Sequence, residues 1–79
     1  MKSIMIRLET IEDVKDFVSI MVQFNGYFDL ASGRYVVDAK SVMGIFSMDL
    51  SKALVLRILE TNERIDDILT ALKSFIVEE

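Results

Sequence analysis

Four charged side chains lie within five consecutive positions near the start of the chain: Glu12, Asp13, Lys15 and Asp16. Clustered carboxylates can transfer protons or bind a divalent cation, and with a metal ion and a lysine nearby they can accept a phosphoryl group. The chain contains no histidine and no cysteine, and no oxygen-rich loop accompanies these acids. We therefore expect the acids to complement the positive end of a helix, and we expect no catalytic residue, no metal and no cofactor.

Composition restricts the class of protein and of partner. The chain has a formal net charge of −4, and its lysines and arginines are scattered, so no basic stripe is present for a nucleic acid. The longest apolar runs are only a few residues, which predicts neither a membrane span nor a secretion signal. The 79 residues should form one domain, 1–79, whose stability comes from a 52% hydrophobic fraction. A cysteine-free chain fits a cytoplasmic protein, and we expect a protein partner.

The spacing of apolar residues changes near position 10. A first group alternates with polar residues, which predicts a strand with one face against a core: Ile4, Ile6 and Leu8. A second group recurs every three or four residues and predicts a helix of about four turns: Ile11, Val14, Phe17, Val18, Met21 and Val22. Thr10 and Asp13 resemble a capping box at the start of this helix, and Asn25-Gly26 is a stop signal.

The middle of the chain predicts a hairpin and a short helix. Tyr27 to Ala31 and Arg34 to Asp38 are prone to form strands, and they flank Ser32-Gly33, which is typical of a two-residue hairpin loop. We expect these two strands to be antiparallel neighbours. The stretch from Ser41 to Leu50 predicts one or two turns of helix, too short to be stable in isolation.

The last third of the chain predicts one strand and one helix. Ala53 to Leu59 is almost continuously apolar and suits a central strand, although the pattern alone does not exclude a helix. A final helix should begin near Asn62-Glu63 and bury one stripe of side chains: Ile65, Ile68, Leu69, Leu72, Phe75 and Ile76. The order β-α-β-β-α-β-α predicts an α+β fold with an open sheet and its helices on one face, since each helix must bury its apolar stripe.

The stretch from Asp38 to Met48, with Lys40-Ser41-Val42-Met43-Gly44 inside it, resembles the regulatory-serine segment of HPr, the phosphocarrier of the bacterial sugar phosphotransferase system. Met21-Val22-Gln23 and the segment from Asp66 to Leu72 are similar in the same register. The order of elements is also that of the HPr fold. The resemblance implies an HPr-like, open-faced β-sandwich over the whole chain, with a four-stranded antiparallel sheet and three helices on one face.

The histidine that carries the phosphoryl group in HPr has no counterpart in this chain. Counting back from Met21-Val22-Gln23 places Val14 at the histidine and Asp16 at a nearby arginine, whereas a shorter loop would move the match toward Glu12 or Asp13. The resemblance therefore implies a degenerate phosphocarrier site. Its acids would also repel an incoming phosphoryl donor, so we do not expect an enzyme. Transfer through one of the carboxylates stays open as an alternative.

Ser41 allows two interpretations that are compatible with each other. Serine before a short helix commonly caps it by accepting a hydrogen bond from a free backbone N–H group. The resemblance implies that Ser41 is also the position that a dedicated kinase phosphorylates, and a phosphate there would lie near the helix start and Lys40. Residues around it either dock a partner or complete the core: Lys40, Val42, Met43 and Phe46. Ile45 and Met48 can serve the core instead.

We therefore expect a non-catalytic, HPr-like regulatory or protein-interaction module of the phosphotransferase system, cytoplasmic and bacterial, possessing a switch at Ser41. The partner implied by the resemblance is an HPr kinase or a transcription regulator, although Asp16 reverses the charge of an arginine used in docking. Two alternatives are a homodimer formed through an open sheet edge or the first strand, and residual phosphocarrier activity.

Overall fold

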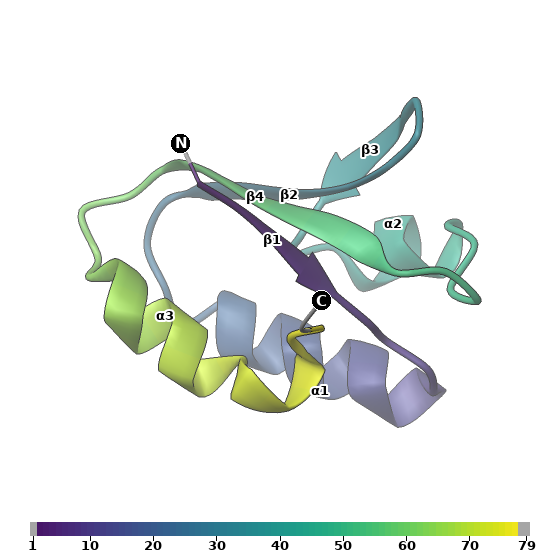
Figure 1. Cartoon of the computed structure of the whole chain (residues 1–79), viewed down its shortest axis with the longest axis horizontal. Helices are drawn as coiled ribbons and strands as arrows, with labels where there is room; N and C mark the ends of the chain where they lie inside the picture. The colour runs from purple at the N-terminus through teal and green to yellow at the C-terminus, as the bar shows by residue number, and fades with distance from the viewer. Residues whose placement is uncertain (1, 78–79) are drawn as a thin grey trace.

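Four strands and three α-helices alternate along residues 2–77, which are the residues that the computed structural model describes. The elements in chain order are β1 (Lys2–Ile6), α1 (Ile11–Met21), β2 (Tyr27–Ser32), β3 (Tyr35–Asp38), α2 (Val42–Phe46), β4 (Leu54–Glu60), α3 (Ile65–Ala71) and a 3₁₀ turn, η1 (Lys73–Phe75). Neighbouring strands are antiparallel, and their order in the sheet is β1-β4-β2-β3 (Figure 1). The predicted order of elements and the central position of β4 are confirmed.

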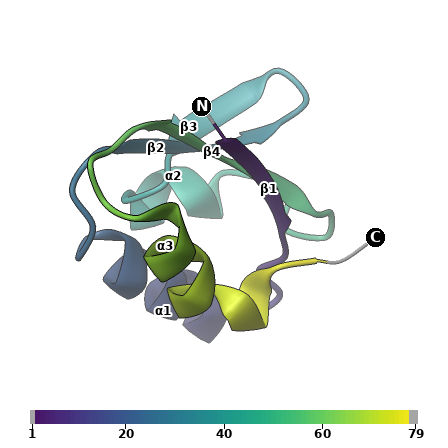
Figure 2. The ribbon, with the colours of Figure 1, turned by 60° about the vertical axis from the view of Figure 1, so that its left-hand side comes forward.

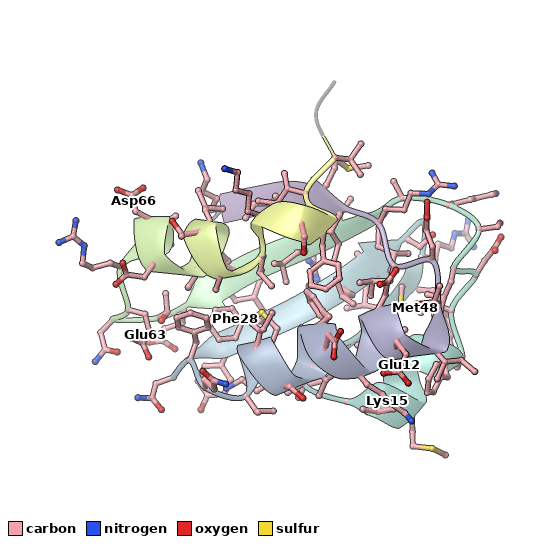
Figure 3. All side chains as sticks on the ribbon, turned by 90° about the horizontal axis from the view of Figure 1, so that it is seen from below. Glu12, Lys15, Phe28, Met48, Glu63 and Asp66 are labelled. Atoms are coloured by element: carbon pink, nitrogen blue, oxygen red, sulfur yellow. The ribbon has the colours of Figure 1, made fainter. Side chains whose placement is uncertain are left out.

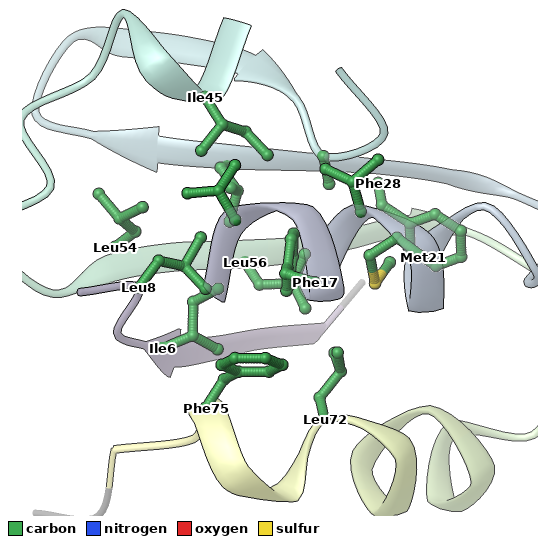
Figure 4. Close-up of a cluster of buried hydrophobic side chains, with 14 of the residues drawn as sticks. Ile6, Leu8, Phe17, Met21, Phe28, Ile45, Leu54, Leu56, Leu72 and Phe75 are labelled. Carbon is green, nitrogen blue, oxygen red and sulfur yellow. The ribbon is translucent and has the colours of Figure 1, made fainter. Parts of the chain in front are cut away.

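The three helices lie on one face of the sheet (Figures 1 and 2). Apolar side chains from this face and from the helices meet in one core, in which the rings of Phe17 and Phe75 pack edge to face with centroids 6.0 Å apart (Figure 4). The strands contribute Ile6, Phe28, Leu30, Leu54, Leu56 and Ile58. The predicted open-faced α+β sandwich is confirmed, since no helix among residues 2–77 covers the other face of the sheet.

The helix α1 is shorter than predicted. It has 11 residues, about three turns instead of four, and it ends at Met21. Gly26 does not end the helix; it has a φ of 139° where the chain enters β2. Ile11 and Val22 were predicted on the buried stripe but are 63% and 55% exposed, because they lie at the two ends of the helix, outside its buried residues.

The β2–β3 hairpin is present, but its loop lies one residue later than predicted. Ser32 pairs with Tyr35, so the loop residues are Gly33-Arg34. Gly33 has a φ of 59°, whereas Arg34 does not have a positive φ. A hairpin turn that needs positive φ only at its first loop position places glycine there, and this requirement explains the shift.

The helix α3 starts later than predicted and carries only part of the predicted stripe. Glu63, near the expected start, instead accepts a hydrogen bond from the backbone N–H of Asn25 (2.8 Å), which ties the loop before α3 to the loop after α1. Leu72 and Phe75 lie beyond the end of α3, in and next to the 3₁₀ turn, yet both are buried. The prediction that Leu72 and Phe75 are buried is therefore confirmed, although these residues do not belong to one continuous helix with α3.

The segment Phe75–Val77 runs along the outer edge of β1. The backbone N–H of Arg7 donates to the Phe75 carbonyl oxygen (2.9 Å), and that of Val77 donates to the Met5 carbonyl oxygen (2.9 Å). Ile6 and Ile76 form an antiparallel bridge between these two bonds. This segment covers part of the edge of β1, and β3 forms the opposite edge of the sheet. Residues 1, 78 and 79 of the predicted domain lie outside the described residues.

Candidate functional site

Hydrogen bonds fix both ends of α2. At its start, Ser41 Oγ accepts a hydrogen bond from the backbone N–H of Gly44 (3.0 Å), so the predicted capping role of Ser41 is confirmed. At its end, Ser47 Oγ donates to the Gly44 carbonyl oxygen (2.6 Å) and accepts from the Tyr35 hydroxyl (2.9 Å). A helix of five residues is too short to be stable in isolation, so these hydrogen bonds at its two ends stabilise it.

Gly44 allows α2 to pack closely against β3. A Cβ atom at this position would lie 3.2 Å from Val37 Cβ and 3.2 Å from Ser41 Oγ, tighter than ordinary van der Waals contact. Ile45, the next residue, is fully buried in the core. The side of α2 that carries Gly44 and Ile45 is therefore packed against the sheet, and the opposite side of the helix faces solvent.

The turn after α2 is fixed in the same way. Met48 is buried, and the Asp49 carboxylate accepts hydrogen bonds from the hydroxyl (2.6 Å) and the backbone N–H (3.0 Å) of Ser51. The hydroxyl bond, followed by the backbone bond, lowers the pKa of Asp49 below its usual value. The expectation that Ile45 and Met48 serve the core is confirmed.

The four predicted docking residues are not equally available to a partner. Met43 is 83% exposed and Phe46 is 41% exposed, so both present apolar surface to solvent. Val42 is half-buried and packs against the core. We call Met43 and Phe46 the α2 patch, since these two side chains remain on the outer side of the helix.

Lys40 makes an intramolecular contact. Its Nζ donates to the Phe24 carbonyl oxygen (2.7 Å) and lies 5.3 Å from the centroid of the Phe28 ring. Its backbone N–H donates to Asp38 Oδ1 (2.8 Å). Because the ammonium group is directed toward the end of α1, it is not positioned to pair with a phosphate on Ser41 or with a partner. The structure therefore differs at Lys40 from the arrangement that we expected.

The acids at the start of α1 serve the helix itself. Thr10 Oγ1 accepts a hydrogen bond from the backbone N–H of Asp13 (3.0 Å). The Asp13 carboxylate accepts bonds from the backbone N–H groups of Thr10 (3.3 Å) and Glu9 (2.9 Å). The predicted capping box is confirmed, and one carboxylate oxygen of Asp13 is occupied by two donors.

Val14, which the first of the two alignments matches to the HPr histidine, is fully buried in the core. A phosphoryl donor cannot reach a side chain in that position. Glu12, Lys15 and Asp16 are exposed, and Figure 3 shows Glu12 and Lys15 on α1 at the end of the molecule where Met48 lies. The alternative match, toward Glu12 or Asp13, is the one that places the predicted phosphocarrier position at the surface.

Arg7 lines the same open depression as Glu9 and Asp13. Its guanidinium group donates to the Ser51 carbonyl oxygen (2.9 Å) and lies 3.4 Å from the Glu9 carboxylate. This cation is therefore engaged by its own chain beside the Asp13 carboxylate. The arrangement supports an acidic helix cap, and it provides no histidine nucleophile for phosphoryl transfer.

Residues 2–77 contain neither a metal-binding cluster nor a helix able to span a membrane. No three histidine, cysteine, aspartate or glutamate side chains in this range are grouped so as to hold a metal ion. Within the same range, no helix has the length and apolar composition needed to cross a membrane.

Comparisons with protein-family models, with curated proteins and with solved structures found no match to this chain.

Tyr35 belongs to the site although the sequence did not single it out. Its hydroxyl group holds Ser47 at the end of α2, twelve residues away in the chain. Side chains alternate between the faces of a strand, so Tyr35 lies on the helix side of β3, the side on which Leu30 is buried. The one-residue error in the predicted loop leaves Tyr35 on that face; alternation indicates the face but not the contact with Ser47.

Replacing Ser41 by alanine is expected to lower the free energy of unfolding by about 1 kcal/mol, because the substitution removes the oxygen that caps α2. Urea unfolding followed by circular dichroism measures the change. Ser41→Asn is the matched control, since its side-chain oxygen can accept the same hydrogen bond, and it should retain most of the stability. Equal losses in both variants would contradict a capping role.

Proposed function

We propose that this protein is a non-catalytic, HPr-like module of the bacterial sugar phosphotransferase system that binds a protein partner in the cytoplasm through the α2 patch. The observation that carries the proposal is the exposure of Met43 and Phe46 on a helix whose start, end and inner side are all fixed. A pre-ordered helix loses little conformational freedom when a partner binds, so the apolar surface it presents can contribute to affinity.

The two side chains of the α2 patch suit different parts of this task. Phe46 offers a large apolar area for two rotatable bonds, which is typical of an anchor that enters a pocket. Met43 is flexible and polarizable, so it can adapt to partners of different shape. The expected partner surface is an apolar groove. An HPr kinase or a transcription regulator is the class of partner that the sequence resemblance implies.

Ser41 is the proposed switch of this interaction. Phosphorylation would add a charge of about −1.5 to −2 directly before Val42 and five positions before Phe46. Lys40 is held by the Phe24 carbonyl oxygen, so its ammonium group is not placed to neutralise that charge. Asp38 lies in the same turn and adds to the negative potential. A phosphate on Ser41 would thus change the charge at the rim of the α2 patch.

The first test of the proposal is phosphorylation of the purified protein. We expect incubation with an HPr kinase and ATP to add one phosphate, detected by intact-mass spectrometry, and we expect Ser41→Ala to remove it. Because Ser41→Ala also removes the helix cap, Ser41→Thr serves as a second variant that keeps a hydroxyl group. An unmodified wild-type protein would contradict the proposed switch.

The second test concerns the α2 patch itself. Phe46→Ala is expected to weaken binding to the purified HPr kinase about tenfold or more in isothermal titration calorimetry, because it removes the anchor. Leu59→Ala is the matched control, since Leu59 is also an exposed apolar residue but lies on β4. If both variants bound as the wild type does, the interaction would use another surface and the α2 patch would be excluded.

A further inference from the structure

We call the sheet face away from the helices the outer face (Figures 1 and 2). A pattern of side chains extends across all four of its strands. Side chains alternate between the faces of a strand, so the pairing register defines which of them share a level across the sheet. One level of the outer face is entirely apolar: Met5, Val55, Ala31 and Val36, in the order of the strands. Val36 is exposed and the other three are half-buried.

The next level of the outer face contains an ion pair in its centre. Arg57 Nε and Nη2 donate to Asp29 Oδ1 and Oδ2, both at 2.6 Å. Asp29 is only 9% exposed although no helix among residues 2–77 covers it, and its hydrogen bond raises the pKa of Arg57. Ser3 and Asp38 complete this level on the two edge strands. Beyond it the register shifts and Tyr27 pairs with Glu60, and the side chains of Tyr27 and Leu59 are exposed.

We propose that the outer face binds the outer face of a second copy of this chain, with the two-fold axis parallel to the strands and between β4 and β2. Rotation about this axis reverses the strand order, so that β4 of one copy faces β2 of the other and β1 faces β3. Each level then faces the same level of the second copy. The apolar level of Met5, Val55, Ala31 and Val36 meets the same level of the second copy, and the ion pairs meet in the centre.

The charges select this axis over the alternative. With the proposed axis, Arg57 of each copy faces Asp29 of the other. An axis across the strands would instead place Arg57 opposite Arg57 and Asp29 opposite Asp29, which is repulsive. A guanidinium group has five N–H donors, so the bidentate bond to Asp29 leaves three for the carboxylate of the second copy.

Side-chain sizes on the apolar level also fit the proposed axis. Val55 faces the small Ala31 of the second copy, and Val36 on one edge faces Met5 on the other. Two stacked sheets pack about 10 Å apart, with their strands rotated by roughly 30° because each sheet is twisted. The central strands β4 and β2 therefore make most of the contact, while the edge strands diverge.

The size of the outer face sets the expected strength of the dimer. Four strands spaced by about 4.8 Å and roughly 20 Å long would bury about 400–500 Å² on each copy. The total is less than the roughly 1,200 Å² at the lower end of stable interfaces. We therefore expect a weak dimer that forms at tens to hundreds of micromolar protein, an order-of-magnitude range set by this small area.

Sedimentation velocity from about 10 μM to 1 mM protein, a range chosen around that affinity, tests the proposal. The wild type should change from monomer to dimer, whereas Val55→Glu should remain monomeric because it places a charge in the apolar level. Met43→Glu is the matched control and should dimerise as the wild type does, since Met43 lies on α2. Val36→Glu repeats the test at a more exposed position should Val55→Glu fail to fold. A wild type that stays monomeric, or a folded Val55→Glu or Val36→Glu that dimerises normally, would overturn the proposal.

Charge reversal tests the ionic level separately. Arg57→Asp and Asp29→Arg each place like charges opposite one another, so neither variant should dimerise alone. An equimolar mixture should form the mixed dimer, because one copy then carries two acids and the other two arginines at this level. Circular dichroism establishes that each variant is folded before the measurement. Folded variants that dimerise alone, or that fail to associate when mixed, would contradict the proposed axis.

Discussion

Phe17→Ala is expected to lower the free energy of unfolding by about 3–5 kcal/mol. Phe17 is fully buried, and its ring packs edge to face on Phe75, so the substitution leaves a cavity in the centre of the core. A domain of 79 residues has a total stability of about 4–12 kcal/mol. The loss is thus a large share of the total, and urea unfolding followed by circular dichroism at 222 nm measures it.

Phe46→Ala is the matched control for this prediction, since it makes the same chemical change in another helix. Phe46 is partly exposed on α2, and the expected loss of stability is below about 1 kcal/mol. The two variants separate stability from recognition, because Phe17→Ala should strongly destabilise the domain and Phe46→Ala should weaken binding of a partner. Comparable losses of stability in both variants would mean that the Phe46 side chain belongs to the core.

Gly26→Ala is expected to lower the free energy of unfolding by about 3 kcal/mol or more. The backbone at Gly26 has a φ of 139°, and a Cβ atom there would lie 2.3 Å from the Glu60 carbonyl oxygen and 2.8 Å from Thr61 Cβ. Both the conformation and the space exclude a side chain, so the entry into β2 must move away from the end of β4. Thermal and urea unfolding measure the effect.

Gly33→Ala is the control for the space around Gly26. Gly33 also has a positive φ, 59°, but a Cβ atom there would meet no other atom within 4 Å. Only the conformational cost of a left-handed residue remains, about 1–2 kcal/mol. If Gly26→Ala cost no more than Gly33→Ala, the close approach to β4 would contribute nothing.

Apolar periodicity predicted most of the fold, because one buried face imposes a period of two on a strand and between three and four on a helix. Val14, Phe17 and Met21 were assigned to the core on this basis and are buried. The pattern wrongly predicted that Ile11 and Val22 are buried. Periodicity identifies the buried side of a helix, but it does not indicate at which residues the helix extends beyond the elements that pack against it.

Contacts between distant polar groups could not be predicted from local patterns. Arg57 lies 28 residues after Asp29, and only the register of β4 against β2 brings them together. Lys40 was expected at the surface beside Ser41, but its long side chain reaches the Phe24 carbonyl oxygen instead. A flexible side chain has many conformations, and the choice among them depends on acceptors that the fold places.

The candidate site was predictable to the extent that it is local. Ser41 precedes a short apolar helix, so its capping role follows from neighbours within three residues. The sequence alone did not indicate that Met43 and Phe46 are exposed while Ile45 is buried, because α2 is too short for its periodicity to identify a buried side. The fold resolves the ambiguity by packing Gly44 and Ile45 against the sheet.

The position of β1 between β4 and the segment Phe75–Val77 affects how the chain folds during its synthesis. β1 is made before the other strands, yet the segments that hydrogen-bond to it come later in the chain. At about 5–20 residues per second, a ribosome needs several seconds to make the roughly fifty to seventy residues between them. In that interval Ile4 and Ile6 have no sheet in which to pack, whereas α1 and the β2–β3 hairpin can already form locally. We therefore expect β1 to join the sheet only after β4 and the segment Phe75–Val77 have been synthesised.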